Sequence, residues 1–261
     1  MDWKIDSTIT LNNKAKMPRL GLGVYQIPNG QATEDAVSWA LQAGYRHIDT
    51  AKFYRNEASV GKAVRESGIP REQIWVTTKV WPIDFMHVEK AFETSLRKLG
   101  LEYIDLYLVH FPIPGLIKRI WGNMEAIYKS GQVKAIGVSN YNVQQLKDTL
   151  ENASIPPSVN QMRCSVFGYN REVYELCQEQ NIVFEAYSPL TRGKQLDNTE
   201  VAKIAKHYQK SAAQILLRWA LQKNMVVIPK SQHQARIIEN ADIFDFVIND
   251  TDMQTLDNLR T

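Results

Sequence analysis

Short apolar runs alternate with segments of helical periodicity along almost the whole chain, and this alternation constrains the fold more than any other feature. Within 84–99 and 211–223 the apolar residues recur at spacings of three and four, which indicates amphipathic helices. Eight strand–helix units predict a parallel sheet covered by helices, and that number favours a closed (β/α)8 TIM barrel of the α/β class. The eight expected strands are residues 20–24, 46–49, 75–79, 104–110, 134–139, 158–161, 183–187 and 226–229.

Two further apolar stretches precede the first unit. Residues 7–11 and 14–18 flank the Asn12-Asn13 pair, which predicts an N-terminal β-hairpin. No linker or low-complexity stretch interrupts the 261 residues, so we expect a single barrel domain over 1–261.

Composition and charge exclude several classes of protein. The chain is 44% hydrophobic and 23% charged, which is typical of a globular protein, and its net charge is only +3 without a basic stripe. A nucleic-acid or membrane partner is therefore not expected. There is no signal-peptide pattern or membrane span, and Cys164 and Cys177 lack metal-type spacing. We expect a cytoplasmic protein.

Polar residues end seven of the eight expected strands. In a (β/α)8 barrel the active site lies at the carboxyl ends of the strands, so these side chains should meet at one rim. Each one alone has a structural explanation, such as capping a helix or pairing with a neighbour. The strand-end residues are Asp49, Lys79, His110, Ser139-Asn140, Gln161, Tyr187-Ser188 and Lys230-Ser231.

Tyr54, just beyond the second strand, can complete a proton-donating group with three of these residues. A phenol is a weak acid, but a nearby ammonium such as Lys79 favours the phenolate and lowers the pKa. Asp49 would hold that ammonium in place, and a neutral His110 could hydrogen-bond a substrate oxygen. Such a group suits carbonyl reduction, which produces an alkoxide that needs a proton.

The hydride would come from a nicotinamide cofactor bound outside a Rossmann motif. GLGVYQ (21–26) lacks the third glycine and the helix start of a dinucleotide-binding loop. Phosphate sites in barrels usually follow the last two strands, and here the loops at 189–198 and 228–240 are basic and rich in hydroxyl groups. Lys230, Ser231 and Arg236 could hold a ribose phosphate, and Arg192 could hold a pyrophosphate. Tyr187 could stack on the nicotinamide ring. Asn140 and Gln161 could hydrogen-bond its carboxamide.

Several motifs, in order and at sensible spacing, resemble the aldo-keto reductase superfamily. The likeness runs from the first strand to the C-terminal helix and is greatest to the microbial branch of 2,5-diketo-gluconate reductases and broad-range aldehyde reductases. The motifs are GYRHIDTAKFYRNEASVGKAV (44–64), LGLEYIDLYLVHFP (99–112), AIGVSNY (135–141), VNQ (159–161), AYSPL (186–190), IPKS (228–231) and ENADIFDF (239–246).

The resemblance implies an enzyme that reduces small-molecule aldehydes or ketones with NADPH, and a monomer. It places the catalytic tetrad on Asp49, Tyr54, Lys79 and His110, with Tyr54 as the proton donor, and substrate contacts on Tyr25, Trp81 and Phe111. In that family the KS…R pattern, here Lys230, Ser231 and Arg236, binds the 2′-phosphate of NADPH. The implied cofactor residues are Ser139, Asn140, Gln161, Tyr187, Ser188, Leu190, Lys230, Ser231, Arg236, Glu239 and Asn240.

The chain departs from the family pattern around the substrate pocket. Tyr25 and Phe111 stand where tryptophan is frequent, MRCSVFGYN (162–170) replaces an acidic His-Pro-containing sequence, and the chain stops at NLRT (258–261). We therefore expect an open pocket with loose specificity for small aldehydes.

Two other functions fit parts of the pattern. A metal-dependent hydrolase could use His47, Asp49 and His110 as ligands, although the Asn, Gln, Tyr and Lys endings of the later strands would make a poor metal cage. A non-catalytic barrel that senses NADPH would bind the cofactor without turning over a carbonyl. The intact tetrad favours the reductase.

Overall fold

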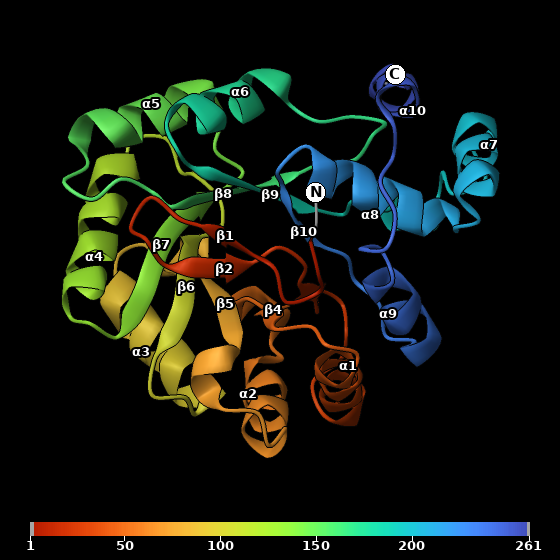
Figure 1. Ribbon diagram of the computed structural model, residues 1–261. Helices are drawn as coiled ribbons and strands as arrows, with labels where there is room; N and C mark the ends of the chain where they lie inside the picture. Colours follow the sequence, from red (N-terminus) through yellow and green to blue (C-terminus); the bar gives the residue numbers. More distant parts are fainter. Residues whose placement is uncertain (1–2, 260–261) are drawn as a thin grey trace.

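The computed structural model describes residues 3–259, and these form the expected barrel (Figure 1). Eight parallel strands pair in chain order, from β3 to β10, and helices surround them on the outside. The (β/α)8 prediction is confirmed, whereas the single-domain organisation of 1–261 stays a prediction. The strands are β3 (Leu22–Gly23), β4 (His47–Asp49), β5 (Trp75–Val80), β6 (Ile104–Val109), β7 (Val133–Ser139), β8 (Val159–Arg163), β9 (Val183–Tyr187) and β10 (Val226–Ile228).

The outer layer consists of helices that bury one face against the sheet. Most connections carry one helix, but α7 and α8 both lie between β9 and β10. None of the helices within residues 3–259 is both long and apolar enough to cross a membrane. The helices are α1 (Gln31–Gln42), α2 (Glu57–Glu66), α3 (Val88–Leu99), α4 (Ile117–Lys129), α5 (Val143–Asn152), α6 (Arg171–Glu179), α7 (Thr199–Tyr208), α8 (Ala212–Gln222), α9 (Gln234–Ala241) and α10 (Asp250–Asp257).

The two helices predicted in detail differ in accuracy at their starts. The helix predicted at 211–223 is α8, which begins after the Ser211 cap. The start predicted at residue 84 is wrong, because Pro82–Asp84 forms a separate 3-10 turn and His87 has a non-helical backbone, so α3 begins at Val88. Periodicity alone could not detect this interruption.

The predicted N-terminal hairpin is confirmed, and it closes the end of the barrel at which the strands begin. Strands β1 (Thr8–Thr10) and β2 (Lys16–Pro18) pair antiparallel and lie across the mouth in Figure 1. Leu11 and Met17 pack into a separate buried cluster with the first residues of the barrel strands, including Trp75 and Val183. The hairpin thus seals the amino-terminal end with apolar side chains, and the carboxyl ends stay open.

Two glycines of GLGVYQ form the seam that closes the barrel. Gly21 N–H donates to the Val227 carbonyl at 2.9 Å, and Gly23 N–H donates to the Pro229 carbonyl at 3.0 Å. A Cβ on Gly21 would lie 2.6 Å from the His47 ring, so no larger residue fits there without rearrangement. Close packing of the first strand against the last, and not phosphate binding, explains these glycines.

Helical glycines give a direct test of the outer layer. A Cβ on Gly61 in α2 would overlap the carbonyl oxygen of Leu99 at the end of α3, whereas a Cβ on Gly122 in α4 would meet open space. We expect Gly61→Ala to lower the free energy of unfolding by about 2–3 kcal/mol, because the two helices must separate. The matched Gly122→Ala should raise it by about 0.5–1 kcal/mol through the helix preference of alanine. Urea denaturation measures both, and a Gly61→Ala protein as stable as the wild type would contradict the close contact between α2 and α3.

Candidate active site

A cavity of about 770 Å³ opens at the carboxyl ends of the barrel strands. This volume lies within the range of small-molecule sites. Every side chain predicted for the site lines the cavity, with the exception of Lys79, which lies fully buried beneath the floor. The alternation of side chains along the neighbouring strands β4 and β5 turns Asp49 and Lys79 into the barrel, where the two side chains meet.

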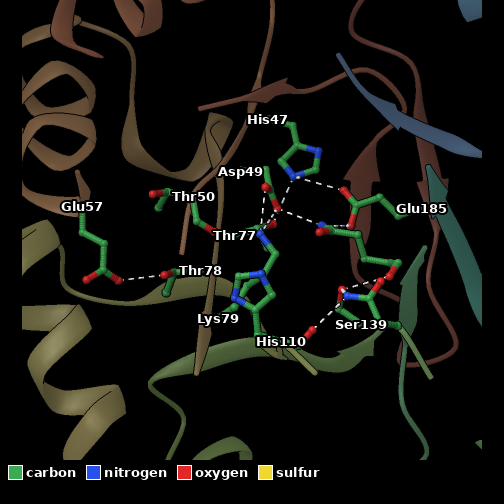
Figure 2. Close-up of polar contacts among 12 residues, drawn as sticks. His47, Asp49, Thr50, Glu57, Thr77, Thr78, Lys79, His110, Ser139 and Glu185 are labelled. Atoms are coloured by element: carbon green, nitrogen blue, oxygen red, sulfur yellow. Dashed lines mark hydrogen bonds and ion pairs between the residues drawn. The ribbon is translucent and has the colours of Figure 1, made fainter. Parts of the chain in front are cut away.

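A buried ion pair lies at the floor of the cavity, with Asp49 in the lining and Lys79 beneath it (Figure 2). Lys79 Nζ donates to Asp49 Oδ1 at 2.8 Å and to Oδ2 at 2.7 Å, and its third N–H donates to the Thr50 carbonyl at 2.8 Å. Burial raises the pKa of the Asp49 carboxyl, and the Lys79 charge and hydrogen bonds oppose that rise. All three ammonium donors are therefore used inside the protein.

Tyr54 stands above this pair, at the end of the 3-10 turn Lys52–Tyr54. Lys79 Nζ lies 5.1 Å from the centroid of the Tyr54 ring, over its face. Burial, followed by the charge of Asp49, raises the pKa of the Tyr54 phenol well above its ordinary value. The expected net lowering of this pKa is not found, because burial and the Asp49 charge, which both raise it, outweigh the effect of the nearby Lys79 ammonium.

His110 closes the other side of the tyrosine. Its ring lies edge-on to the Tyr54 ring, with centroids 5.6 Å apart. Burial and the nearby Lys79 charge lower the pKa of His110 to about 2. The imidazole is therefore neutral at physiological pH, as the sequence predicts.

The amide of Asn140 ties three strand ends together. Its Nδ2 donates to the His110 carbonyl and to Ser139 Oγ, both at 3.0 Å, and its Oδ1 accepts from the Tyr187 hydroxyl at 2.9 Å. Asn140 and Ser188 both adopt left-handed backbone conformations, with φ of 63° and 54°. These turns direct the strand-end side chains into the cavity, and they leave Asn140 already hydrogen-bonded within the protein.

Part of the cavity lining carries positive charge. Arg192, Lys230 and Arg236 form this part, and the chain passes from Lys230 and the buried Ser231 directly into the start of α9. Partial burial lowers the pKa of Lys230. Three cations beside a helix N-terminus make a site suited to an anion.

Aromatic side chains form the open mouth. The Trp81 ring stacks on Phe53 with centroids 4.0 Å apart and meets Phe111 edge-on at 5.8 Å, and Tyr25 packs against the Tyr54 ring at 4.9 Å. Phe53 was not predicted from the sequence, although it lines the cavity and remains 43% exposed. Its position next to Tyr54 in the sequence could have indicated that it lines the cavity.

The sequence prediction also missed a polar layer directly beneath the floor. Glu185, in the middle of β9, is fully buried and accepts a hydrogen bond from Gln161 at 2.9 Å. His47 Nε2 lies 3.0 Å from Thr77 Oγ1 and 3.7 Å from Glu185 Oε1 (Figure 2). A glutamate within the apolar run VFEAY was the signal that could have found this layer.

The metal-hydrolase alternative gains no support from these contacts. The Lys79 ammonium occupies both oxygens of Asp49, where a metal ion would have to bind. Among residues 3–259, no three His, Cys, Asp or Glu side chains are grouped as a metal site.

Comparison with known proteins agrees with the resemblance in the sequence. The family model for the aldo/keto reductase family matches residues 19–261. An uncharacterized oxidoreductase, YtbE, of Bacillus subtilis is 46% identical, with 99% of this chain and 95% of that protein covered. Glyoxal reductase of the same organism is 44% identical over the same shares of each chain.

A solved structure shows the same fold. The crystal structure of an aldo-keto reductase enzyme from a Medee basin deep-sea metagenome library superposes with a TM-score of 0.93 at 44% identity, covering 97% of this chain and 95% of that one. With a family model and relatives that match nearly its whole length, the protein belongs to the aldo/keto reductase family and is an oxidoreductase.

Proposed function

We propose that the protein reduces small aldehydes and ketones to alcohols with NADPH. The observation that carries this proposal is one cavity with two sets of lining residues: Tyr54 and His110 above the buried Lys79–Asp49 pair, and the cations Arg192, Lys230 and Arg236. The first set suits proton transfer to a reacting oxygen, and the second suits the phosphates of a dinucleotide.

The residues present fit NADPH in both charge and chemistry. Lys230, Ser231 and Arg236 would hold the 2′-phosphate at the start of α9, where N–H groups and the helix dipole also favour an anion. Arg192 would neutralise the pyrophosphate, and Tyr187 with the amides of Asn140 and Gln161 would receive the nicotinamide. Ser139, Ser188, Leu190, Glu239 and Asn240 line the same cavity and complete the proposed cofactor site.

The protein's own residues would then hold the proton and donate it to the substrate oxygen. When bound, the nicotinamide supplies a hydride to the carbonyl carbon. The raised pKa of Tyr54 keeps its phenol protonated, so a proton is available for the oxygen as it becomes an alkoxide. The Lys79 ammonium over the ring would stabilise the phenolate that forms, while Asp49 holds the ammonium there. Neutral His110 would hydrogen-bond the carbonyl oxygen.

The mouth of the cavity indicates the substrate class. Tyr25, Phe53, Trp81 and Phe111 offer aromatic surface to the reacting group. The name of glyoxal reductase, one of the relatives, supports small aldehydes as substrates. The cytoplasmic location and the monomeric state stay predictions.

The role of Tyr54 is tested by removing its hydroxyl. Tyr54→Phe should leave the Kd for NADPH within about twofold and lower the rate of carbonyl reduction by about 10²–10⁴-fold, because the proton donor is lost. Stopped-flow or steady-state loss of NADPH absorbance with a panel of glyoxals, sugar aldehydes, keto acids and aromatic aldehydes measures the rate. Tyr128→Phe, which removes a hydroxyl that only accepts from Asn13 far from the cavity, is the matched control.

Two outcomes would argue against the proposal. A Tyr54→Phe enzyme that keeps most of its rate would exclude Tyr54 as the donor. A wild-type protein that binds NADPH but oxidises it with no carbonyl compound of the panel would favour the cofactor-sensing alternative.

The preference for NADPH depends on Arg236. Arg236→Ala should weaken NADPH binding by about 10–100-fold, since a charge-assisted contact with the 2′-phosphate is lost, and NADH binding by less than about threefold. Arg119→Ala removes an exposed arginine from α4 and serves as the control. Quenching of protein fluorescence gives both dissociation constants, and equal losses for the two cofactors would show that Arg236 does not recognise the 2′-phosphate.

A further inference from the structure

Glu185 is a buried carboxyl group that the proposed mechanism does not use. It projects into the barrel from β9, two residues before Tyr187, and is fully buried. Its Oε2 accepts from Gln161 Nε2 at 2.9 Å, and its Oε1 faces His47 Nε2 at 3.7 Å (Figure 2). Burial of a carboxyl group in a barrel core is costly, so its place here calls for a physical reason.

The amide of Gln161 is the link between Glu185 and the cavity. Gln161 Nε2 donates one hydrogen bond to Asp49 Oδ2 at 2.8 Å and one to Glu185 Oε2 at 2.9 Å. An amide nitrogen has two hydrogens, so both donors are engaged by carboxyl groups of the interior. The side chain also lines the cavity, and Oε1 is the polar atom that these two bonds leave available.

Two acceptors fix the plane of an amide, whereas one acceptor leaves it free to rotate. With Asp49 alone, the Gln161 amide could tilt about its last torsion over a wider range while its single bond bends. Glu185 supplies the second acceptor, on the other side of Nε2. The pair therefore determines not only which atom of Gln161 faces the interior but also the direction in which Oε1 points.

The geometry points to Glu185 as a positioning residue, which locks the Gln161 amide so that Oε1 is presented to the carboxamide N–H₂ of the nicotinamide. This inference rests on the proposed function, because it assumes that a nicotinamide occupies the cavity beside Tyr54. Glu185 touches neither substrate nor cofactor in this account and acts only through Gln161.

The charge state of Glu185 suits such a role. Burial, followed by the charge of Asp49, raises the pKa of Glu185 to about 8. The neighbouring titratable groups are His47, which is kept neutral by burial, and the Asp49–Lys79 pair. Near neutral pH the carboxyl is thus largely protonated, with one oxygen to accept from Gln161. A glutamine has the same shape and also offers one acceptor oxygen.

A comparison of two substitutions tests the inference. Glu185→Met fills a similar volume without an acceptor, whereas Glu185→Gln preserves the acceptor. The experiment measures the Kd of each protein for NADPH and for 2′,5′-ADP, which carries the phosphates but no nicotinamide. Thermal unfolding of each variant is recorded alongside, and the wild type is measured first.

Loss of one neutral hydrogen bond should appear only where the nicotinamide binds. We expect Glu185→Met to weaken NADPH binding by about three- to tenfold and to leave 2′,5′-ADP binding unchanged. Glu185→Gln should restore NADPH binding to within about twofold of the wild type. In a Gln161→Leu background, Glu185→Met should cause no further loss, because the link to the cofactor is already broken.

Several results would overturn the inference. Equal weakening of NADPH and 2′,5′-ADP would mean that Glu185 supports the barrel as a whole, and unchanged NADPH binding in Glu185→Met would mean that the amide needs no second acceptor. A Glu185→Gln protein as weak as Glu185→Met would show that hydrogen bonding is not the cause. If Glu185→Met does not fold, Glu185→Ala carries the same expectations. A wild-type protein that fails to bind NADPH would instead overturn the proposed function itself.

Discussion

The ion pair between Lys79 and Asp49 is the interaction on which the rest of the site depends. Both side chains are almost fully buried, and removal of one partner of such a pair typically costs about 3–5 kcal/mol because the other charge is left in the dry interior. The pair joins β4 to β5, and through the Thr50 carbonyl it also holds the start of the segment that carries Tyr54. A single cation therefore connects the stability of the barrel with the placement of its proposed proton donor.

The barrel interior is divided into an apolar lower part and a polar upper part. Below, the hairpin residues Leu11 and Met17 seal the mouth against water. Above, His47, Glu185 and the ion pair lie in a region that water does not reach from beneath. The same desolvation accounts for the low pKa of His110 and the raised pKa values of Tyr54 and Glu185. Burial within the polar part of the barrel thus governs the protonation states of these three groups.

Local patterns in the chain predicted the fold and most of the cavity lining, because both follow from alternation along the strands. The carboxyl ends of barrel strands meet at one rim, so the positions of Asp49, His110 and Gln161 at that rim follow from the sequence alone. The direction of the Tyr54 pKa could not be predicted, because it depends on how far burial outweighs a cation already neutralised by Asp49. Phe53 and Glu185 were not predicted for a related reason, because their roles arise from contacts between segments far apart in sequence. Phe53 stacks on Trp81, and Glu185 accepts a hydrogen bond from Gln161.

The two engaged donors of the Asn140 amide have a consequence for how binding energy is distributed along the proposed dinucleotide. Both of its N–H donors already serve the protein, so a carboxamide oxygen arriving there exchanges one bond for another and gains little, and only the second lone pair of Oδ1 can add a new bond. Tight binding must then come mainly from the cationic residues of the cavity, Arg192, Lys230 and Arg236. The residues around Tyr54 can then bind the ground state weakly. Their charges and hydrogen bonds are left to stabilise the transition state.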